Sequence, residues 1–446
     1  MKNMTEGSPV KLLIGFIVPL LLGLLFQQFY YMVDMIVVGK FLGMEALAGV
    51  GSTDSINFLV LGFCTGTCAG FSIPVAQKFG QQDMEGLRRI VGNIIWLGVF
   101  LAAGITVLVT FLCRHILTWM HTPAETFGYA YQYLFIVFLG IPATMLYNML
   151  SGIIRSLGDS RTPLYFLIFS SALNILLDMV LILWAGMGVA GAATATVTAQ
   201  LLSGVLCLLY MVRRYPVLHL SREHMKLRGE ESGILLSMGI PMGLQYSITA
   251  VGSILLQSSI NHLGAIYMAA ATAGGRALAL LGCPYEAIGT AAATFTGQNV
   301  GAGRLDRVHR GLASNLILGL IYSALALAAV LLWGRPLLML FLNPGEPQAM
   351  TILELGRQFL LGNVLFYSCL LCVNLFRFSI QGMGFSKLAI IAGALELIAR
   401  AALGVFMVPK LGFIAACFAS PAAWVLADLF LIPMYFAGVR TLRGRV

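Results

Sequence analysis

The chain has 446 residues, of which 59% are hydrophobic and only 10% are charged, and its formal net charge is +9. Soluble proteins carry about 25% charged residues, and a soluble chain with this composition would leave much apolar surface in water. A cytosolic enzyme is therefore excluded as the default interpretation. Membrane orientation explains the excess of basic residues better than nucleic-acid binding does.

Apolar stretches long enough to cross a bilayer follow one another along the chain. A spanning helix needs about 20 mostly apolar residues, so the sequence predicts twelve spans joined by short connections. The first stretch is too long for a signal peptide and no small-residue cleavage site follows it, so we expect it to be retained. The predicted spans are residues 10–38, 46–77, 89–113, 126–154, 163–184, 188–212, 233–261, 266–299, 311–334, 350–376, 387–408 and 412–437.

A polar interruption, RRYPVLHLSREHMKLRGEES, divides these spans into two sets of six. The sequence predicts an N-terminal six-helix bundle over 1–212, a cytoplasmic linker over 213–232 and a C-terminal six-helix bundle over 233–446. Twenty of the 27 Lys and Arg residues fall on the side of the linker and both termini, four on the other side and three within spans. This bias predicts cytoplasmic termini.

The two halves resemble each other at a nearly constant offset. The segment PVAQKFGQQDMEGLRR (74–89) aligns with FTGQNVGAGRLDRVHR (295–310) at an offset of 221. Each half has an even number of spans, so the repeat is parallel, and transporters with such repeats bind substrate between the halves. Further aligned pairs are Gly43 and Gly264, Pro19 and Pro241, and Gly158 and Gly384.

Polar side chains from three predicted spans fall at a similar depth in the outer half. Asp34 lies roughly 9 Å below the outer end marked by Lys40, and both Asp178 and Thr196 lie about 12 Å deep. Asn174 precedes Asp178 by one helical turn and shares its face. Ionisable groups in lipid are costly and usually functional, so we expect a site for a proton, Na⁺ or an organic cation.

A structural interpretation of the same residues stays open, with Asn174 and Asp178 joining helices and Asp34 reaching the outer interface. Pro19 lies 15 residues before Asp34 in the same span and removes one helical hydrogen bond. It could bend the helix when the charge of Asp34 changes, or it could form a static kink.

The second half carries ionisable residues of its own. Glu396 and Arg400 are one turn apart with the acid first, which suits a neutralising ion pair, and a role in lining a cavity stays open as the alternative. Arg276 lies within the eighth span, where we expect it to require an acidic or carbonyl partner.

Taken together, these motifs resemble the MATE family, the multidrug and toxic compound extrusion transporters, over essentially the full length. The first span has Pro19, Tyr30 and Asp34 followed by VGKFLG, and the fifth has Asn174-x-x-x-Asp178. RSLGDSRTP follows the fourth span, GAATAT lies in the sixth, and TFTGQNVGAG ends the eighth. The resemblance implies an all-α membrane protein with twelve helices in two six-helix bundles, related by a parallel pseudo-two-fold repeat in a V-shaped fold.

The resemblance also implies a function: export of cationic amphiphilic compounds in exchange for H⁺ or Na⁺, with no other cofactor. In the DinF-like branch the coupling cation binds in the N-terminal bundle, and the NorM-like branch uses acids in the second bundle. Gln245 and Arg276 occupy regions where the NorM-like branch has acids, so the resemblance favours the DinF-like branch. The matching coupling residues are Asp34, Asn174, Asp178 and Thr196, with Tyr30 nearby and Pro19 at the bend.

The runner-up function is a flippase for lipid-linked precursors, for which Arg276 and Arg400 would provide positive charge in the second bundle. An intramembrane enzyme is disfavoured because the sequence contains no HExxH, GxSxG or paired metal-ligand spacing. We expect the partners to be small organic cations and the lipid bilayer, with no nucleic acid, and the protein to be a monomer. The short loops indicate a bacterial or archaeal cytoplasmic membrane.

Overall fold

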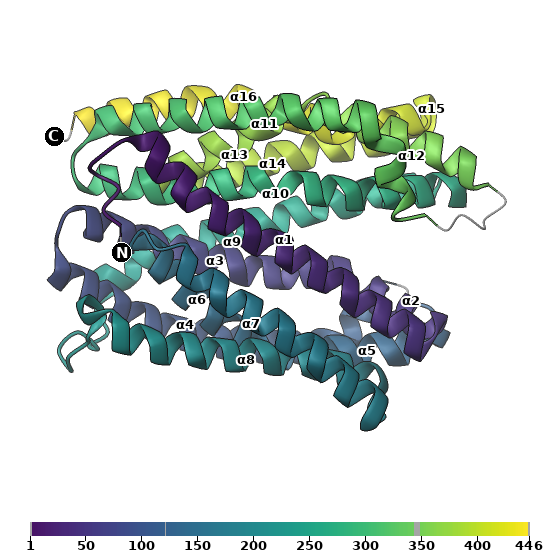
Figure 1. Ribbon diagram of the computed structural model, residues 1–446, viewed down its shortest axis with the longest axis horizontal. Coiled ribbons are helices and arrows are strands. Elements are labelled where there is room, and N and C mark those ends of the chain that lie inside the picture. Colours follow the sequence, from purple (N-terminus) through teal and green to yellow (C-terminus); the bar gives the residue numbers. More distant parts are fainter. Residues whose placement is uncertain (1, 121, 343–347, 445–446) are drawn as a thin grey trace. The chain divides into compact units, whose positions relative to one another are not determined.

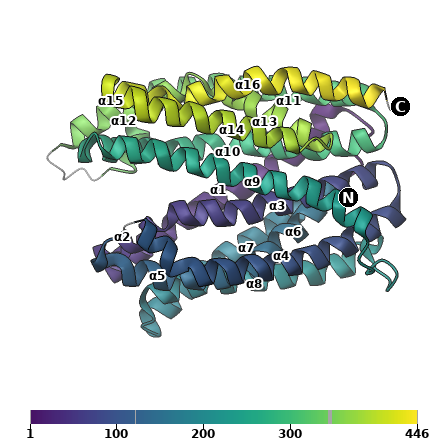
Figure 2. The ribbon, with the colours of Figure 1, turned by 180° about the vertical axis from the view of Figure 1, so that it is seen from behind.

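The computed structural model describes residues 2–120, 122–342 and 348–444, and the regular elements within them are helices. The chain forms two compact units. Unit 1 comprises Met1–Asn3 and Val18–Leu244, and unit 2 comprises Met4–Ile17 and Gln245–Val446. Figures 1 and 2 show long helices running alongside one another within each unit.

Two helices belong to both units. Helix α1 begins in unit 2 and ends in unit 1, and α9 begins in unit 1 and ends in unit 2. The elements up to α9 are α1 (Pro9–Leu42), α2 (Met44–Ser52), α3 (Asp54–Gly80), α4 (Met84–Trp119), α5 (Ala124–Leu139), α6 (Ile141–Ser156), α7 (Arg161–Asp178), the π-helical η1 (Met179–Trp184), α8 (Gly188–Arg214), the 3₁₀ turn η2 (Pro216–Leu218) and α9 (Gly229–Asn261).

The remaining elements all lie in unit 2. They are α10 (Ala265–Gly301), α11 (Leu305–Met339), α12 (Ala349–Val364), α13 (Tyr367–Gly382), α14 (Lys387–Ala402), the π-helical η3 (Leu403–Met407), α15 (Val408–Leu411) and α16 (Phe413–Arg443).

The number of spans agrees with the prediction from hydropathy. Ten helical segments of the described chain are long and apolar enough to cross a membrane. Two further pairs, α5 with α6 and α12 with α13, are bent by 47° and 48° and complete twelve spans if each pair crosses once. The predicted second span is interrupted at Thr53, where α2 ends and α3 begins. The all-helical membrane fold is therefore confirmed.

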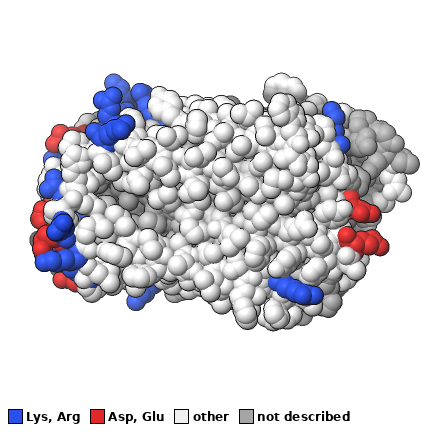
Figure 3. All heavy atoms as spheres, turned by 90° about the horizontal axis from the view of Figure 1, so that it is seen from below, with Lys and Arg blue, Asp and Glu red and all other residues white. Residues whose placement is uncertain are grey.

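The surface of these helices is that of a protein surrounded by lipid. Large aliphatic side chains such as Leu325 on α11 and Val107 on α4 are 63% and 68% exposed. Trp119, Trp184 and Trp333 are exposed near the ends of α4, η1 and α11 that the charge bias assigns to the outer side, where amphipathic rings favour the interface. In the face shown in Figure 3, charged residues gather at the two ends and leave a broad uncharged band between them.

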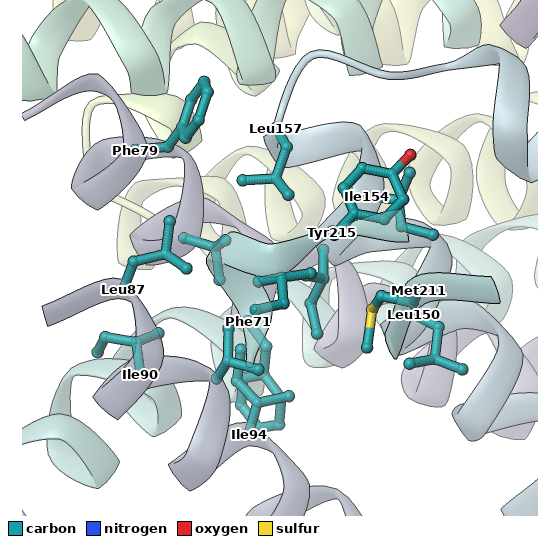
Figure 4. Close-up of a cluster of buried hydrophobic side chains, with 14 of the residues drawn as sticks. Phe71, Phe79, Leu87, Ile90, Ile94, Leu150, Ile154, Leu157, Met211 and Tyr215 are labelled. Carbon is teal, nitrogen blue, oxygen red and sulfur yellow. The ribbon is translucent and has the colours of Figure 1, made fainter. Parts of the chain in front are cut away.

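A buried apolar cluster holds the predicted cytoplasmic half of unit 1 together. Phe71 on α3, Ile94 on α4, Ile154 on α6 and Met211 on α8 meet in it (Figure 4), and Leu235 on α9 joins the same cluster. A methyl group added to Gly70 would lie 2.6 Å from the Cα of Gly239, so α3 and the first half of α9 approach backbone to backbone. This contact explains why unit 1 extends to residue 244.

The predicted linker over 213–232 is docked onto α4. The Trp96 Nε1 donates to the Met225 carbonyl oxygen at 2.7 Å, and the Asn93 Oδ1 accepts from the Arg228 N–H at 2.9 Å and from the Ser232 hydroxyl at 3.0 Å. The polarity of the segment predicted a connection but could not predict these partners. The units found in the structure accordingly have other boundaries than the predicted bundles 1–212 and 233–446.

Residues 4–17 also belong to a different unit than the prediction placed them in, because unit 2 binds the backbone at their start. The Met4 N–H donates to the Gln298 Oε1 at 2.8 Å, and Arg304 Nη1 donates to the Thr5 carbonyl at 2.6 Å. Arg307 Nη2 adds a hydrogen bond to the Met4 carbonyl at 3.1 Å.

Aligned positions of the internal repeat share local structure. Gly43 and Gly264 precede α2 and α10 with φ angles of 89° and 114°, which favour glycine. The fifth span of each half also changes to π-helix near its outer end, at η1 in the first half and at η3 in the second. The two halves thus share these features, although the break at Thr53 between α2 and α3 has no counterpart in the continuous α10.

Candidate functional site

Unit 1 buries the three acidic and amide side chains that the sequence singled out. Asp34 on α1 is 4% exposed, and Asn174 and Asp178 on α7 are 2% and 0% exposed. Asp178 is the last α-helical residue before η1, and π-helical turns are frequent at functional sites. This burial is incompatible with Asp34 reaching the outer interface, so the alternative of a snorkelling Asp34 is wrong.

The structure brings the four predicted coupling residues together in unit 1. The Asn174 Nδ2 donates to the Thr196 hydroxyl on α8 at 3.2 Å. The carboxyl groups of Asp34 and Asp178 lie within electrostatic range of each other. Ionised carboxylates are acceptors only, so a hydrogen bond between these two requires a proton held by one of them.

Several oxygens of this group have no hydrogen-bond donor in the described part of the chain. They are Asp34 Oδ1, Asn174 Oδ1 and both carboxylate oxygens of Asp178. Buried polar atoms are normally satisfied, and exceptions point to an unfilled role such as binding an ion. Carboxylate, amide and hydroxyl oxygens are also the ligands that hard cations prefer.

Two tyrosines complete the surroundings of the carboxyl pair. Tyr30 on α1, which the family resemblance places near the coupling residues, is 8% exposed and within electrostatic range of Asp34. Tyr133 on α5 is 9% exposed and within electrostatic range of Asp34, Asp54 and Asp178. Sequence reasoning missed Tyr133 because α5 contains several aromatic residues and no periodicity distinguishes this one.

A small apolar cluster packs around the predicted outer side of the site. It joins Val38 on α1, Val50 on α2, Ile182 in η1 and Val189 on α8 with Tyr133. Its side chains exclude water and lower the local dielectric, which strengthens the attraction between the carboxylates and any bound cation.

The predicted bending residue Pro19 lies inside a continuous α1. The division between the two units falls between residues 17 and 18, directly before this proline. In α9 the division falls between 244 and 245, shortly after Pro241. Both helices that the units share therefore lack a backbone N–H donor near the point of division. Whether α1 bends there when Asp34 changes charge remains a prediction.

In unit 2 the predicted ion pair of Glu396 and Arg400 is present, with 3.0 Å between the Glu396 Oε2 and the Arg400 Nη2. Arg377 on α13 binds the other oxygen of Glu396 and is 6% exposed. The predicted tenth span ends at residue 376, directly before Arg377, but α13 continues to Gly382, so this arginine lies within the helix and not in a connection. Gln245 is 5% exposed and packs against Gly393 on α14.

The expectation for Arg276 is also wrong. This side chain on α10 is exposed, and within the described residues it has no acidic or carbonyl partner. Nothing in the hydropathy of the eighth span indicated which face of the helix Arg276 would occupy.

Comparison with known proteins agrees with this architecture. The model of the MatE family matches residues 19–180 and 241–406, one stretch in each half of the chain. The chain belongs to the MatE family. Among its relatives is the probable multidrug resistance protein YpnP of Bacillus subtilis (strain 168), 31% identical over 365 residues that cover 82% of this chain and 80% of YpnP.

Two further MatE comparisons extend this result. The probable multidrug resistance protein YoeA of the same organism is 29% identical over 74% of this chain and 73% of YoeA. A solved structure of a multidrug resistance MATE family transporter in an outward-facing conformation superposes with a TM-score of 0.92, at 21% identity and over 99% of both chains. This likeness establishes the fold, and the family places the chain among multi-pass membrane proteins.

Proposed function

We propose that this MatE-family protein is a secondary active multidrug antiporter that exports cationic amphiphilic compounds in exchange for H⁺ or Na⁺ by alternating access. The names of YpnP and YoeA support the multidrug part of this proposal. The observation that carries the coupling part is the buried pair Asp34 and Asp178, which lies beside the hydrogen-bonded Asn174 and Thr196. Among the described residues, Asp34 Oδ1 and both carboxylate oxygens of Asp178 have no hydrogen-bond donor.

The physical argument rests on the cost of unpaired charge in the membrane. Two neighbouring carboxylates repel each other, and burial makes each ionised form more costly. A proton shared by Asp34 and Asp178 removes this repulsion, and a Na⁺ bound by their oxygens with Asn174 and Thr196 does the same. An empty site is therefore a high-energy state, and the energy released on binding the cation can drive a conformational change in unit 1.

Two substitutions in unit 1 and one in unit 2 test the proposal. We would measure ethidium uptake into inverted vesicles while a ΔpH and a Na⁺ gradient are imposed separately. Asp34→Asn and Asp178→Asn should each abolish gradient-driven uptake. Asp428→Asn, which changes a buried aspartate of unit 2 that is 8% exposed, should retain it.

Each outcome has a distinct meaning for the proposed antiport. Uptake driven by one gradient and lost in both unit 1 variants would support the proposal and name the ion. Undiminished coupled uptake by both Asp34→Asn and Asp178→Asn would refute the assigned site. Reporter fusions to the N- and C-termini test the proposed cytoplasmic location of both ends.

The flippase for lipid-linked precursors stays the second candidate. The acids of unit 1 disfavour a pyrophosphate, but the exposed Arg276 of unit 2 favours a substrate with an anionic group. Arg276 therefore provides an argument about whether the substrate carries an anionic group.

A further inference from the structure

Helix α10 has a single exposed face, and its composition differs from that of helices in contact with lipid. Its exposed residues follow one another at intervals of three, four or seven positions, so they form one stripe along the helix. They are Ala265, Met268, Thr272, Arg276, Ala279 and Glu286.

This stripe has only one large apolar side chain, Met268, which is 41% exposed. The exposed face of α11 in the same unit instead contains Ile321, Leu325 and Leu332 at 55%, 63% and 69% exposure. Side chains that face acyl chains are apolar, because a polar group there loses its hydrogen bonds to water and finds no new partner. The small and polar stripe of α10 therefore faces water.

Arg276 lies deep in this stripe. It is eleven residues after Ala265, the first residue of α10, which corresponds to about 16 Å along the helix. That depth is near the middle of a hydrocarbon layer about 30 Å thick. An arginine there is costly in lipid, so its exposure requires water or a charged ligand.

Four other arginines in the helices of unit 2 each have a carboxylate partner. Arg377 and Arg400 bind Glu396, and Arg335 and Arg357 lie within 4 Å of Glu354. Arg276 has no such carboxylate among the described residues, and Glu286 on the same stripe is ten residues away, about 15 Å along the helix. Its guanidinium is therefore available to an anion from outside the chain.

We propose that Arg276 is a substrate-binding residue that recognises an anionic group, a carboxylate or a phosphate, on an amphiphilic substrate. The planar guanidinium binds both groups through two parallel hydrogen bonds. This inference rests on the proposed transport function and narrows its substrate class: amphiphiles with an anionic group bind better than otherwise identical cations.

A matched pair of probes tests this inference. Rhodamine B carries a free carboxylate, and its ethyl ester is the same dye without it. Purified protein in detergent at low salt should bind the acid about tenfold more tightly than the ester, since a hydrogen bond between charged groups contributes about 1.5 kcal/mol or more. Arg276→Gln should remove this preference and leave ester binding unchanged, and Arg276→Lys should retain part of it.

Arg114→Gln is the matched control. Arg114 is also an exposed arginine within a span, but it lies five residues before the end of α4, where its side chain reaches the interface. This variant should keep the preference for the acid. A second pair of competitors distinguishes a phosphate from a carboxylate source. Dioctanoyl phosphatidylglycerol carries a phosphate and dioctanoylglycerol does not. Displacement of rhodamine B by the anionic lipid alone indicates that the site accepts a phosphate.

The outcomes separate this inference from the proposed antiport. Equal binding of acid and ester by the wild type, binding of neither, or an unchanged preference in Arg276→Gln would overturn the role of Arg276. If the role of Arg276 is overturned but an ion gradient still drives transport of the ester, the antiport proposal stands. If binding depends on Arg276 but neither gradient drives transport of either dye, the antiport proposal fails and the anion site stands.

Discussion

Removing the carboxylate of Glu396 should destabilise unit 2 strongly, because two buried arginines depend on it. Glu396 is 2% exposed, and Arg377 and Arg400 are each 6% exposed. Glu396→Ala removes two charge-assisted hydrogen bonds, each contributing about 1.5–3 kcal/mol, and leaves two buried charges without this partner. Breaking buried ion pairs in this way costs about 3–5 kcal/mol.

The chain provides a matched control in the same unit. Glu354 also pairs with two arginines, at 3.1 Å to Arg335 and 3.6 Å to Arg357, but its side chain is 47% exposed. Exposed ion pairs contribute about 0–1 kcal/mol because water and salt screen them. Glu354→Ala should therefore change the stability far less than Glu396→Ala, although both remove the same number of ion pairs.

Unfolding in detergent can be followed with a thiol-reactive dye, because the cysteines in the described chain are free and most are buried. Glu396→Ala should lower the apparent unfolding temperature much more than Glu354→Ala. The triple variant Arg377→Met, Glu396→Met, Arg400→Met should recover most of the loss, since replacing a whole buried ion cluster by apolar groups is often neutral. Equal losses for the two single variants, or a triple variant less stable than Glu396→Ala, would refute this reasoning.

Two further predictions concern the predicted cytoplasmic side of unit 1. A methyl group on Gly92 would lie 2.0 Å from the His224 carbonyl oxygen, so Gly92→Ala should displace the docked linker and speed its cleavage by trypsin, whereas Gly104→Ala, with nothing within 4 Å, should not. Burial alone would raise the pKa of Asp159, but hydrogen bonds led by that from the Tyr215 hydroxyl outweigh it and hold this pKa below its usual value. The resulting stabilisation is present above the unfolded pKa of about 3.9 and disappears as the pH falls through the folded value, so Asp159→Asn should lower the unfolding temperature at pH 7 and much less at pH 3. Equal losses at both pH values would contradict this assignment.

The sequence predicted the spans and the internal repeat because the membrane itself imposes them. Every backbone group in lipid must bond within its own helix, so hydropathy and length define the spans directly. The depth of Asp34, Asp178 and Thr196 followed from the same arithmetic of 1.5 Å per residue. These residues could be assigned to one site before their contacts were known.

Hydropathy could not predict the rotation of each helix or the partners of its polar residues. Arg377 and Arg276 both lie in apolar spans, yet one is buried against Glu396 and the other is exposed. Tyr133 was missed for the same reason. The docking of the linker onto Trp96 and Asn93 depends on hydrogen bonds between distant segments, which leave no periodic signal in the sequence.

The two units treat buried charge in different ways despite the internal repeat that relates them. In unit 2 the carboxylate of Glu396 is neutralised by two arginines, and Asp428 has Arg377 within electrostatic range. In unit 1 the buried Asp34 and Asp178 have no basic partner within the described residues, so only a cation from outside can neutralise them. Binding a proton or Na⁺ therefore changes the energy of unit 1 far more than that of unit 2. The proposed coupling is therefore asymmetric, with the proposed ion site in unit 1 and the proposed site for an anionic group on α10 of unit 2.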